Sequence, residues 1–175
     1  MKNSLKKKIA KIRLVIFDVD GVLTDGRIIV DDNGQEIKNF HVQDGFGIVL
    51  LRKAGFKTAI ISARATKAVV ARANDLKIDR VFEAAFPKTT AYEGLLKEFQ
   101  LKDEEVCFVG DDLPDLCVLK RVGLAITVPN AVDEVKKVAH YTTKKSGGHG
   151  AAREVVELIL KTQGKWKAIV QSFCN

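Results

Sequence analysis

Two aspartates follow the first strongly apolar run of the chain. The run 15–17 leads directly to Asp18 and Asp20, and Gly21 then interrupts it. β-Branched and aromatic residues favour a strand, and side chains two apart on a strand share one face. We therefore expect both carboxylates near the carboxyl end of a strand, where open α/β sheets bind ligands. Two carboxylates placed there need a cation, a proton-transfer role, or both.

Three further polar residues occupy comparable positions. Ser62 and Asp111 come just after apolar runs, and Lys88 starts a helical pattern after Phe86-Pro87. A doubly wound sheet brings the carboxyl ends of its parallel strands to one edge. We therefore expect these three side chains to join the two aspartates in one site.

These residue types fit phosphoryl transfer. Asp18 can attack phosphorus to form an aspartyl phosphate, and Asp20 can protonate the leaving oxygen and then activate water. Mg²⁺ takes a few carboxylate ligands and neutralises the charge between nucleophile and phosphate, which suits Asp18 and Asp111. The hydroxyl of Ser62 and the ammonium of Lys88 can hold the remaining phosphoryl oxygens.

Two more acids in the segment 110–115 allow alternative interpretations. Asp112 and Asp115 can be N-cap or first-turn residues of a helix near 113, where the helix dipole favours negative charge. Asp112 can also affect a magnesium site without binding the ion, by interacting with the residues that ligate it. The spacing leaves these alternatives open.

Strand-like and helical segments alternate along the chain, which predicts a doubly wound, Rossmann-like parallel α/β sheet. The expected strands are 14–17, 58–61, 80–82, 106–109 and 124–128. The expected helices fall near 46–54, 66–76, 89–99, 113–121, 131–138 and 150–162, with Gly55 just past the end of the first. We expect a flexible loop at 144–150 and a flexible tail at 163–175.

A β-hairpin is expected at about 26–41, because Asn33-Gly34 lies between two β-like runs. It follows the two aspartates directly and should project beside the site. The gaps between Asp20, Ser62 and Lys88 leave no room for a cap domain, which needs ~50 residues. Because a phosphatase must exclude water from its pocket, we expect a neighbouring subunit to complete it, with the hairpin as an assembly element.

Length and composition predict one domain, residues 1–175, with 46% hydrophobic and 29% charged residues. Much of the net charge of +7 lies near the two ends of the chain, in Lys2, Lys6, Lys7, Lys8, Lys11, Arg13, Lys161, Lys165 and Lys167. We interpret these as solvated terminal residues, because no nucleic-acid module accompanies them. The positive excess favours an anionic small substrate.

Cysteine usage and hydropathy bear on location. The odd set Cys107, Cys117 and Cys174 has no metal or disulfide spacing, and we expect the first two in the core. No apolar run approaches the ~20 residues of a membrane span, and no signal peptide is recognised. A reducing cytoplasm without membrane association is the expected location.

The motifs together resemble those of the haloacid dehalogenase-like phosphohydrolases. Asp-x-Asp-Gly, a Ser, a Lys and Gly-Asp-Asp-x-x-Asp occur here in that family's order. A closer likeness, to a capless branch acting on 3-deoxy-D-manno-octulosonate 8-phosphate, covers about 12–165. It rests on the segments 18–26, 33–34, 41–47, 147–154 and 163–165.

This resemblance implies Mg²⁺-dependent hydrolysis of that phosphate in lipopolysaccharide biosynthesis, by a homotetramer whose tails reach neighbouring sites. It implies magnesium ligands at Asp18, the Asp20 backbone carbonyl and Asp111. The implied substrate contacts are Asp20, His41, Val42, Gln43, Asp44, Gly45, Arg64, Arg72 and Lys88. Two of these, Arg64 and Arg72, lie about two helical turns apart and could share a face.

Four residues depart from the branch pattern: Gln43, Val49, Pro114 and His149. Because two of the departures replace basic residues near the sugar site, a nine-carbon sugar acid 9-phosphate, N-acylneuraminate or its deaminated analogue, stays open as substrate. A phospho-acceptor domain and a regulatory subunit of a cytidylyltransferase are further alternatives. Asp20 argues against the former, since a general acid/base promotes hydrolysis rather than storage.

Overall fold

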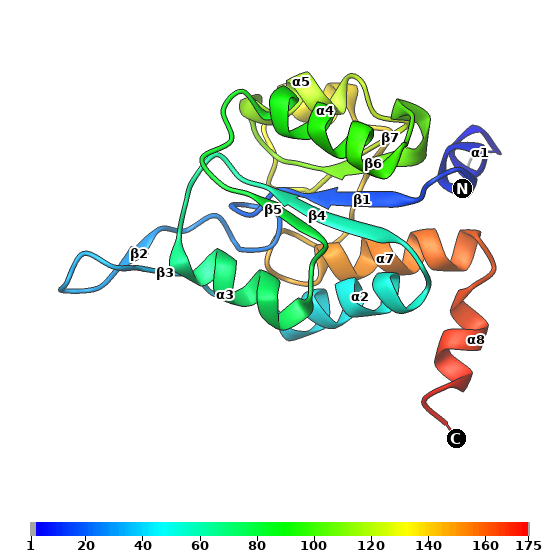
Figure 1. Cartoon of the computed structure of the whole chain (residues 1–175), viewed down its shortest axis with the longest axis horizontal. Coiled ribbons are helices and arrows are strands. Elements are labelled where there is room, and N and C mark those ends of the chain that lie inside the picture. The colour runs from blue at the N-terminus through cyan, green and yellow to red at the C-terminus, as the bar shows by residue number, and fades with distance from the viewer. Residues whose placement is uncertain (1–2, 175) are drawn as a thin grey trace.

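A six-stranded parallel sheet forms the centre of the computed structural model, which describes residues 3–174 and so leaves out Lys2 of the basic start. The strand order is β5-β4-β1-β6-β7-β8 (Figure 1). The strands are β1 (Leu14–Phe17), β4 (Lys57–Ile61), β5 (Arg80–Phe82), β6 (Val106–Val109), β7 (Leu124–Thr127) and β8 (Tyr141–Thr142). The predicted doubly wound α/β fold is confirmed.

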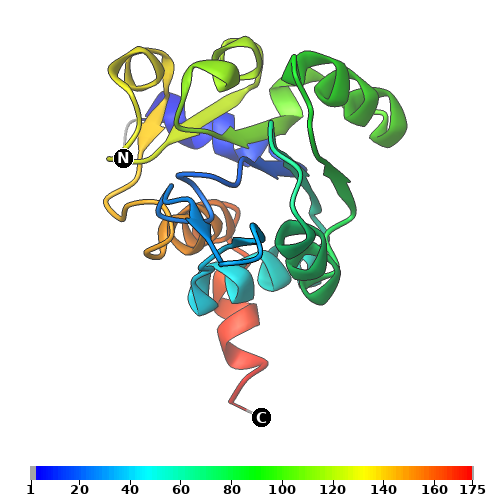
Figure 2. The same ribbon diagram turned by 90° about the vertical axis from the view of Figure 1, so that its left-hand side faces the viewer.

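Helices cover both faces of this sheet. One face carries α1 (Asn3–Ala10), α2 (Val42–Lys53), α3 (Lys67–Leu76) and α7 (Ala151–Thr162), and the other carries α4 (Lys88–Phe99), α5 (Leu116–Leu119) and α6 (Asp133–Val138). Two short 3₁₀ turns, η1 (Asp103–Glu105) and η2 (Leu113–Asp115), precede β6 and α5. The last helix, α8 (Trp166–Gln171), projects away from the sheet (Figures 1 and 2).

The central strand β1 shows why this sequence specifies two layers of helices. Its side chains alternate between the faces of the sheet, and all four are fully buried. Val15 and Phe17 pack with the α2 and α7 side, whereas Leu14 and Ile16 pack with the α4 and α5 side. A strand that is apolar throughout therefore holds both layers, and the chain continues from it directly into Asp18.

The predicted hairpin is present, as β2 (Ile29–Val30) paired antiparallel with β3 (Glu36–Ile37). Its turn differs from the two-residue Asn-Gly type. The backbone N–H of Gly34 donates to the carbonyl of Asp31 at 2.9 Å, and Gly34 has φ +74°. A type I turn followed by a left-handed glycine closes longer hairpin loops in this way.

No cap domain occurs in the part of the chain that the structure describes. The hairpin and α2 occupy the stretch between β1 and β4, and α3 and β5 occupy the stretch before α4. Within residues 3–174, no helix has both the length and the apolar content for crossing a membrane. Cys107 is buried in the core as expected, Cys117 is half-buried, and Cys174 is exposed.

Some elements differ from the prediction. The segment expected as a helix at 113–121 forms η2, which carries Pro114 in its first turn, followed by the short α5. Two helices and one strand, α1, α8 and β8, lie where the sequence predicts none. Each of the three has at most one fully buried side chain, so the apolar periodicity that reveals buried elements is weak there.

Candidate active site

The carboxyl edge of the sheet holds one cavity of about 250 Å³, and four predicted residues line it with Asp20. Asp18 follows β1, Ser62 follows β4, Asp111 lies beyond β6, and Lys88 starts α4. β1 lies between β4 and β6 in the sheet, which brings these strand ends together. This is the switch point at which doubly wound sheets bind ligands.

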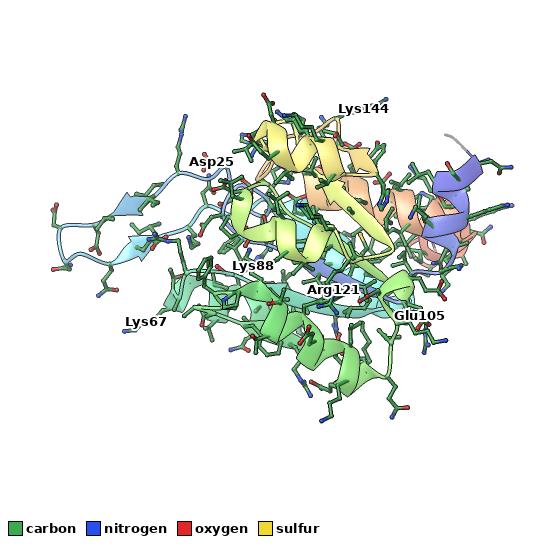
Figure 3. All side chains as sticks on the ribbon, turned by 90° about the horizontal axis from the view of Figure 1, so that it is seen from above. Asp25, Lys67, Lys88, Glu105, Arg121 and Lys144 are labelled. Carbon is green, nitrogen blue, oxygen red and sulfur yellow. The ribbon has the colours of Figure 1, made fainter. Side chains whose placement is uncertain are left out.

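Lys88 is the charged centre of the cavity. Its ammonium lies 2.8 Å from Oδ1 of Asp18 and 2.6 Å from Oδ1 of Asp115, and its side chain is 1% exposed. Burial opposes the charged form, but the two carboxylates outweigh it and raise the pKa of Lys88. Lys88 is therefore held as an ammonium, ready to face an anion. Figure 3 shows it toward the same end of the molecule as Asp25.

Asp115, one of the two acids left open by the sequence, belongs to this cluster. Its Oδ1 pairs with Lys88, and its Oδ2 accepts from the backbone N–H groups of Asp111 at 2.8 Å and Asp112 at 3.2 Å. Asp112 instead caps η2 by accepting from the N–H of Leu113 at 2.7 Å. The Gly-Asp-Asp-x-x-Asp spacing was the signal for Asp115.

Three carboxylates crowd the cavity. Oxygens of Asp18, Asp111 and Asp115 lie within 4.8 Å of one another. Burial, with repulsion from Asp115, raises the pKa of Asp18 to about 7. Burial, with repulsion from Asp18, raises the pKa of Asp111 to about 8. A bound cation would relieve this crowding.

The loop after β1 is tied down from several directions. The Thr24 hydroxyl accepts from the N–H of Gly21 at 3.4 Å, and the Asn130 side chain donates to the carbonyl of Gly21 at 2.8 Å. The same Asn130 accepts from the N–H of Gly147 at 2.9 Å. The segment 144–150, predicted as a flexible loop, thus packs against the loop that carries Asp20. No pattern in the sequence pointed to Asn130.

Arg64 and Arg72 do not share a helical face, contrary to the expectation. Arg64 precedes α3, where its N–H donates to the Ser62 hydroxyl at 3.2 Å. It lines the catalytic cavity, whereas Arg72 lies on α3 and pairs with Asp75 at 2.7 Å. Thr66 accepts from the N–H of Val69 and so starts the helix two residues after Arg64.

The remaining predicted contacts lie outside the catalytic cavity. The segment 41–45 begins α2, and His41, Asp44 and Gly45 line a separate small cavity together with Arg72. Val42 and Gln43 are exposed. The Asp44 carboxylate accepts from the N–H groups of Gly150 and Arg153, so it holds the start of α7.

Comparisons with known proteins agree with this geometry. The chain is 43% identical over 159 residues to 3-deoxy-D-manno-octulosonate 8-phosphate phosphatase KdsC of Yersinia pestis, covering 91% of this chain and 85% of that one. The chain belongs to the KdsC family. Residues 78–155 also match the broader family of haloacid dehalogenase-like hydrolases.

Solved structures of KdsC relatives share the whole fold. The phosphatase from Moraxella catarrhalis, crystallised with a magnesium ion, a phosphate ion and a KDO molecule, has a TM-score of 0.96 and 40% identity, covering 99% of both chains. The cobalt-bound phosphatase from Haemophilus influenzae has a TM-score of 0.91 and 38% identity, covering 96% of this chain and 99% of that one. The KdsC fold is thus shared from end to end.

Proposed function

We propose that the chain is a Mg²⁺-dependent phosphatase that hydrolyses 3-deoxy-D-manno-octulosonate 8-phosphate to the free sugar acid and phosphate, a step in lipopolysaccharide biosynthesis. One observation carries the proposal. Asp18, Ser62, Lys88 and Asp111 converge on a single cavity, and the fold matches a phosphatase crystallised with magnesium, phosphate and KDO. The proposal treats the chain as one hydrolase domain.

The chemistry assigned to the chain follows from these positions. Asp18 attacks phosphorus and forms an aspartyl phosphate as the ester P–O bond breaks; Asp20 protonates the leaving oxygen and then takes a proton from the attacking water. Lys88 and Ser62 hold phosphoryl oxygens as charge redistributes. Arg64, which lines the same cavity, contributes a further positive charge for the anionic substrate.

The residues present fit a magnesium ion. Oδ1 of Asp111 is buried without a hydrogen-bond partner among the described residues. The carboxylate of Asp18 lies beside it. Asp115 is already engaged by Lys88 and two backbone N–H groups. We therefore assign the ion to Asp18 and Asp111, and the resemblance to the KdsC family implies the Asp20 carbonyl as a further ligand. When bound, Mg²⁺ neutralises charge between nucleophile and phosphate.

We also propose a homotetramer in which a neighbour completes the pocket. Apolar side chains of the hairpin are exposed, namely Ile28, Ile29, Val30 and Ile37, and such patches mark association surfaces. Val42 and Gln43 are exposed and lie outside the catalytic cavity of their own chain, so they are available to a substrate bound by another subunit.

The substrate is tested by steady-state kcat/KM on a panel of sugar-acid phosphates with Mg²⁺. The eight-carbon 8-phosphate should give the highest value. A higher value for a nine-carbon 9-phosphate would replace the proposed substrate and keep the chemistry. No phosphate release from any member would overturn the proposed function.

The nucleophile is tested by Asp18→Asn. The variant should fold as the wild type does, by circular dichroism, and release no phosphate. Trapping of ³²P on the wild type during turnover, and its absence in Asp18→Asn, would support the intermediate. A magnesium-dependent, active Asp18→Asn variant would contradict the assignment.

A further inference from the structure

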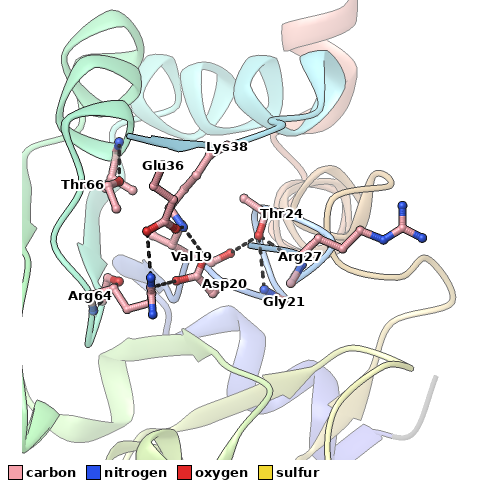
Figure 4. A network of polar contacts seen from close by, with 12 residues as sticks. Val19, Asp20, Gly21, Thr24, Arg27, Glu36, Lys38, Arg64 and Thr66 are labelled. Atoms are coloured by element: carbon pink, nitrogen blue, oxygen red, sulfur yellow. Dashed lines mark hydrogen bonds and ion pairs between the residues drawn. The ribbon is translucent and has the colours of Figure 1, made fainter. Parts of the chain in front are cut away.

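Four charged side chains form a closed ring beside the catalytic cavity. Lys38 donates to Oδ1 of Asp20 at 2.5 Å and to Oε1 of Glu36 at 2.6 Å. Oε2 of Glu36 accepts from Arg64 at 2.8 Å, and Nε of Arg64 lies 3.9 Å from Oδ2 of Asp20 (Figure 4). The ring alternates in sign and has no net charge.

Lys38 is the enclosed member of this ring. Its side chain is 1% exposed, compared with 25% for Asp20 and 47% for Arg64. It does not line the catalytic cavity, and Asp20 is the cavity residue that it contacts directly. Burying an ammonium costs free energy unless the ammonium is paired. Lys38 is therefore expected to keep its contact with Asp20.

We propose that Lys38 is a positioning residue, which fixes the orientation in which Asp20 protonates the leaving oxygen. This inference rests on the proposed phosphatase function. It also gives the hairpin a role inside its own chain, because Lys38 directly follows β3 and Glu36 begins β3.

Apart from Lys38, the contacts that hold the Asp20 side chain are weak. The side chains of Thr24 and Asn130 hold the backbone of Gly21, but they leave the Asp20 carboxylate free to rotate about its side-chain bonds. Without Lys38, its remaining ion-pair partner is Arg64 at 3.9 Å, and exposed pairs contribute little. A misplacement of about 1 Å costs on the order of 10²-fold in rate.

The decisive measurement compares two esters in Lys38→Met. The leaving oxygen of an alkyl phosphate, such as the sugar-acid phosphate, needs a proton. The p-nitrophenolate of p-nitrophenyl phosphate leaves without one. We expect kcat/KM, which reports phosphoryl transfer to Asp18 and excludes the later hydrolysis in which Asp20 is the base, to fall about tenfold or more for the alkyl ester and less than about threefold for the aryl ester. Equal losses on both esters, or no loss, would overturn the proposal.

Lys67→Met is the matched control, since this exposed lysine enters no ion pair among residues 3–174. It should leave both rates unchanged. In an Asp20→Asn background, Lys38→Met should cause no further loss on the alkyl ester, and a further loss would contradict action through Asp20.

A second variant covers the case in which Lys38→Met does not fold by circular dichroism. Glu36→Gln retains Lys38 and removes the charge of its second carboxylate partner. It should therefore lower the rate on the alkyl ester more than on the aryl ester, by a smaller factor than Lys38→Met does. An unselective loss would overturn the proposal. A wild type that is inactive on both esters would overturn the underlying phosphatase function instead.

Discussion

The ammonium of Lys88 lies 2.6 Å from Oδ1 of Asp115, and each of the two side chains is 1% exposed. The other oxygen of Asp115 accepts from the backbone N–H groups of Asp111 and Asp112. Asp115 therefore joins the base of the cavity, where Lys88 pairs with Asp18, to the loop that carries Asp111.

Asp115→Asn should destabilise the protein, because it leaves the buried Lys88 with one carboxylate instead of two. Removing one partner of a buried pair costs about 3–5 kcal/mol, and urea unfolding without Mg²⁺ measures it. The control is Asp112→Asn, since Asp112 is exposed and caps a single N–H; its cost should be about 1 kcal/mol or less. Equal costs for the two variants would refute this role of Asp115.

Gly21→Ala should harm both stability and the metal site. Gly21 has φ +85°, and a Cβ there would lie 2.0 Å from Oδ2 of Asp111. Gly34→Ala is a matched control, because Gly34 also has positive φ but faces open space; it should cost about 1 kcal/mol from backbone strain. Thermal unfolding of Gly21→Ala should show a larger loss and little response to Mg²⁺.

Magnesium should raise the melting temperature of the wild type. A ligand at a hundredfold excess over its Kd adds about 2.7 kcal/mol, which is about 5 °C or more for a chain of this size. Asp111→Asn should lose most of this shift, because it removes the negative charge of the carboxylate whose buried Oδ1 lacks a partner, whereas Asp112→Asn should keep it. Sodium chloride at matched ionic strength gives the baseline; an equal shift in Asp111→Asn would contradict the assignment.

Acid stability should depend on Asp79. Burial would raise the pKa of Asp79, but the N–H and hydroxyl of Thr58 and the ammonium of Lys57 outweigh it and hold the pKa below 3.8. The resulting stabilisation is fully present above pH 3.8 and disappears as the pH falls through the lower folded-state value. The stability difference between wild type and Asp79→Asn should therefore be large at pH 6 and shrink below pH 3.8.

Urea unfolding across this pH range measures the effect of Asp79. Asp32→Asn serves as the reference, because Asp32 is an exposed residue of the hairpin turn. A difference between wild type and Asp79→Asn that stays constant down to pH 3 would contradict the assignment.

The sheet and the edge that holds the cavity could be predicted because β1 and β6 are apolar at every position; β1 leads directly into Asp18, and β6 leads through Gly110 into Asp111. Strand order then follows from general rules of handedness and connection. Gly55 was likewise recognisable as the residue just past the end of α2, and its N–H donates to the carbonyl of Arg52.

The ring around Lys38 could not be predicted in the same way. Glu36 and Lys38 lie two apart and so share a face of a strand, but that pattern is equally typical of a solvated hairpin. Its partners come from elsewhere in the chain, Asp20 after β1 and Arg64 after β4. Only the folded arrangement shows that an apparently surface lysine is enclosed.

Basic side chains of α1 and acidic side chains of the hairpin turn lie at opposite ends of the sheet. Lys6 and Lys7 on α1 lie at the end opposite the hairpin (Figure 1), whose turn carries Asp31 and Asp32. The four residues of β1 alone span about 13 Å, more than the Debye length of about 8 Å at physiological salt. A cation-exchange surface that binds α1 would therefore leave the hairpin and the cavity beside it facing the solution.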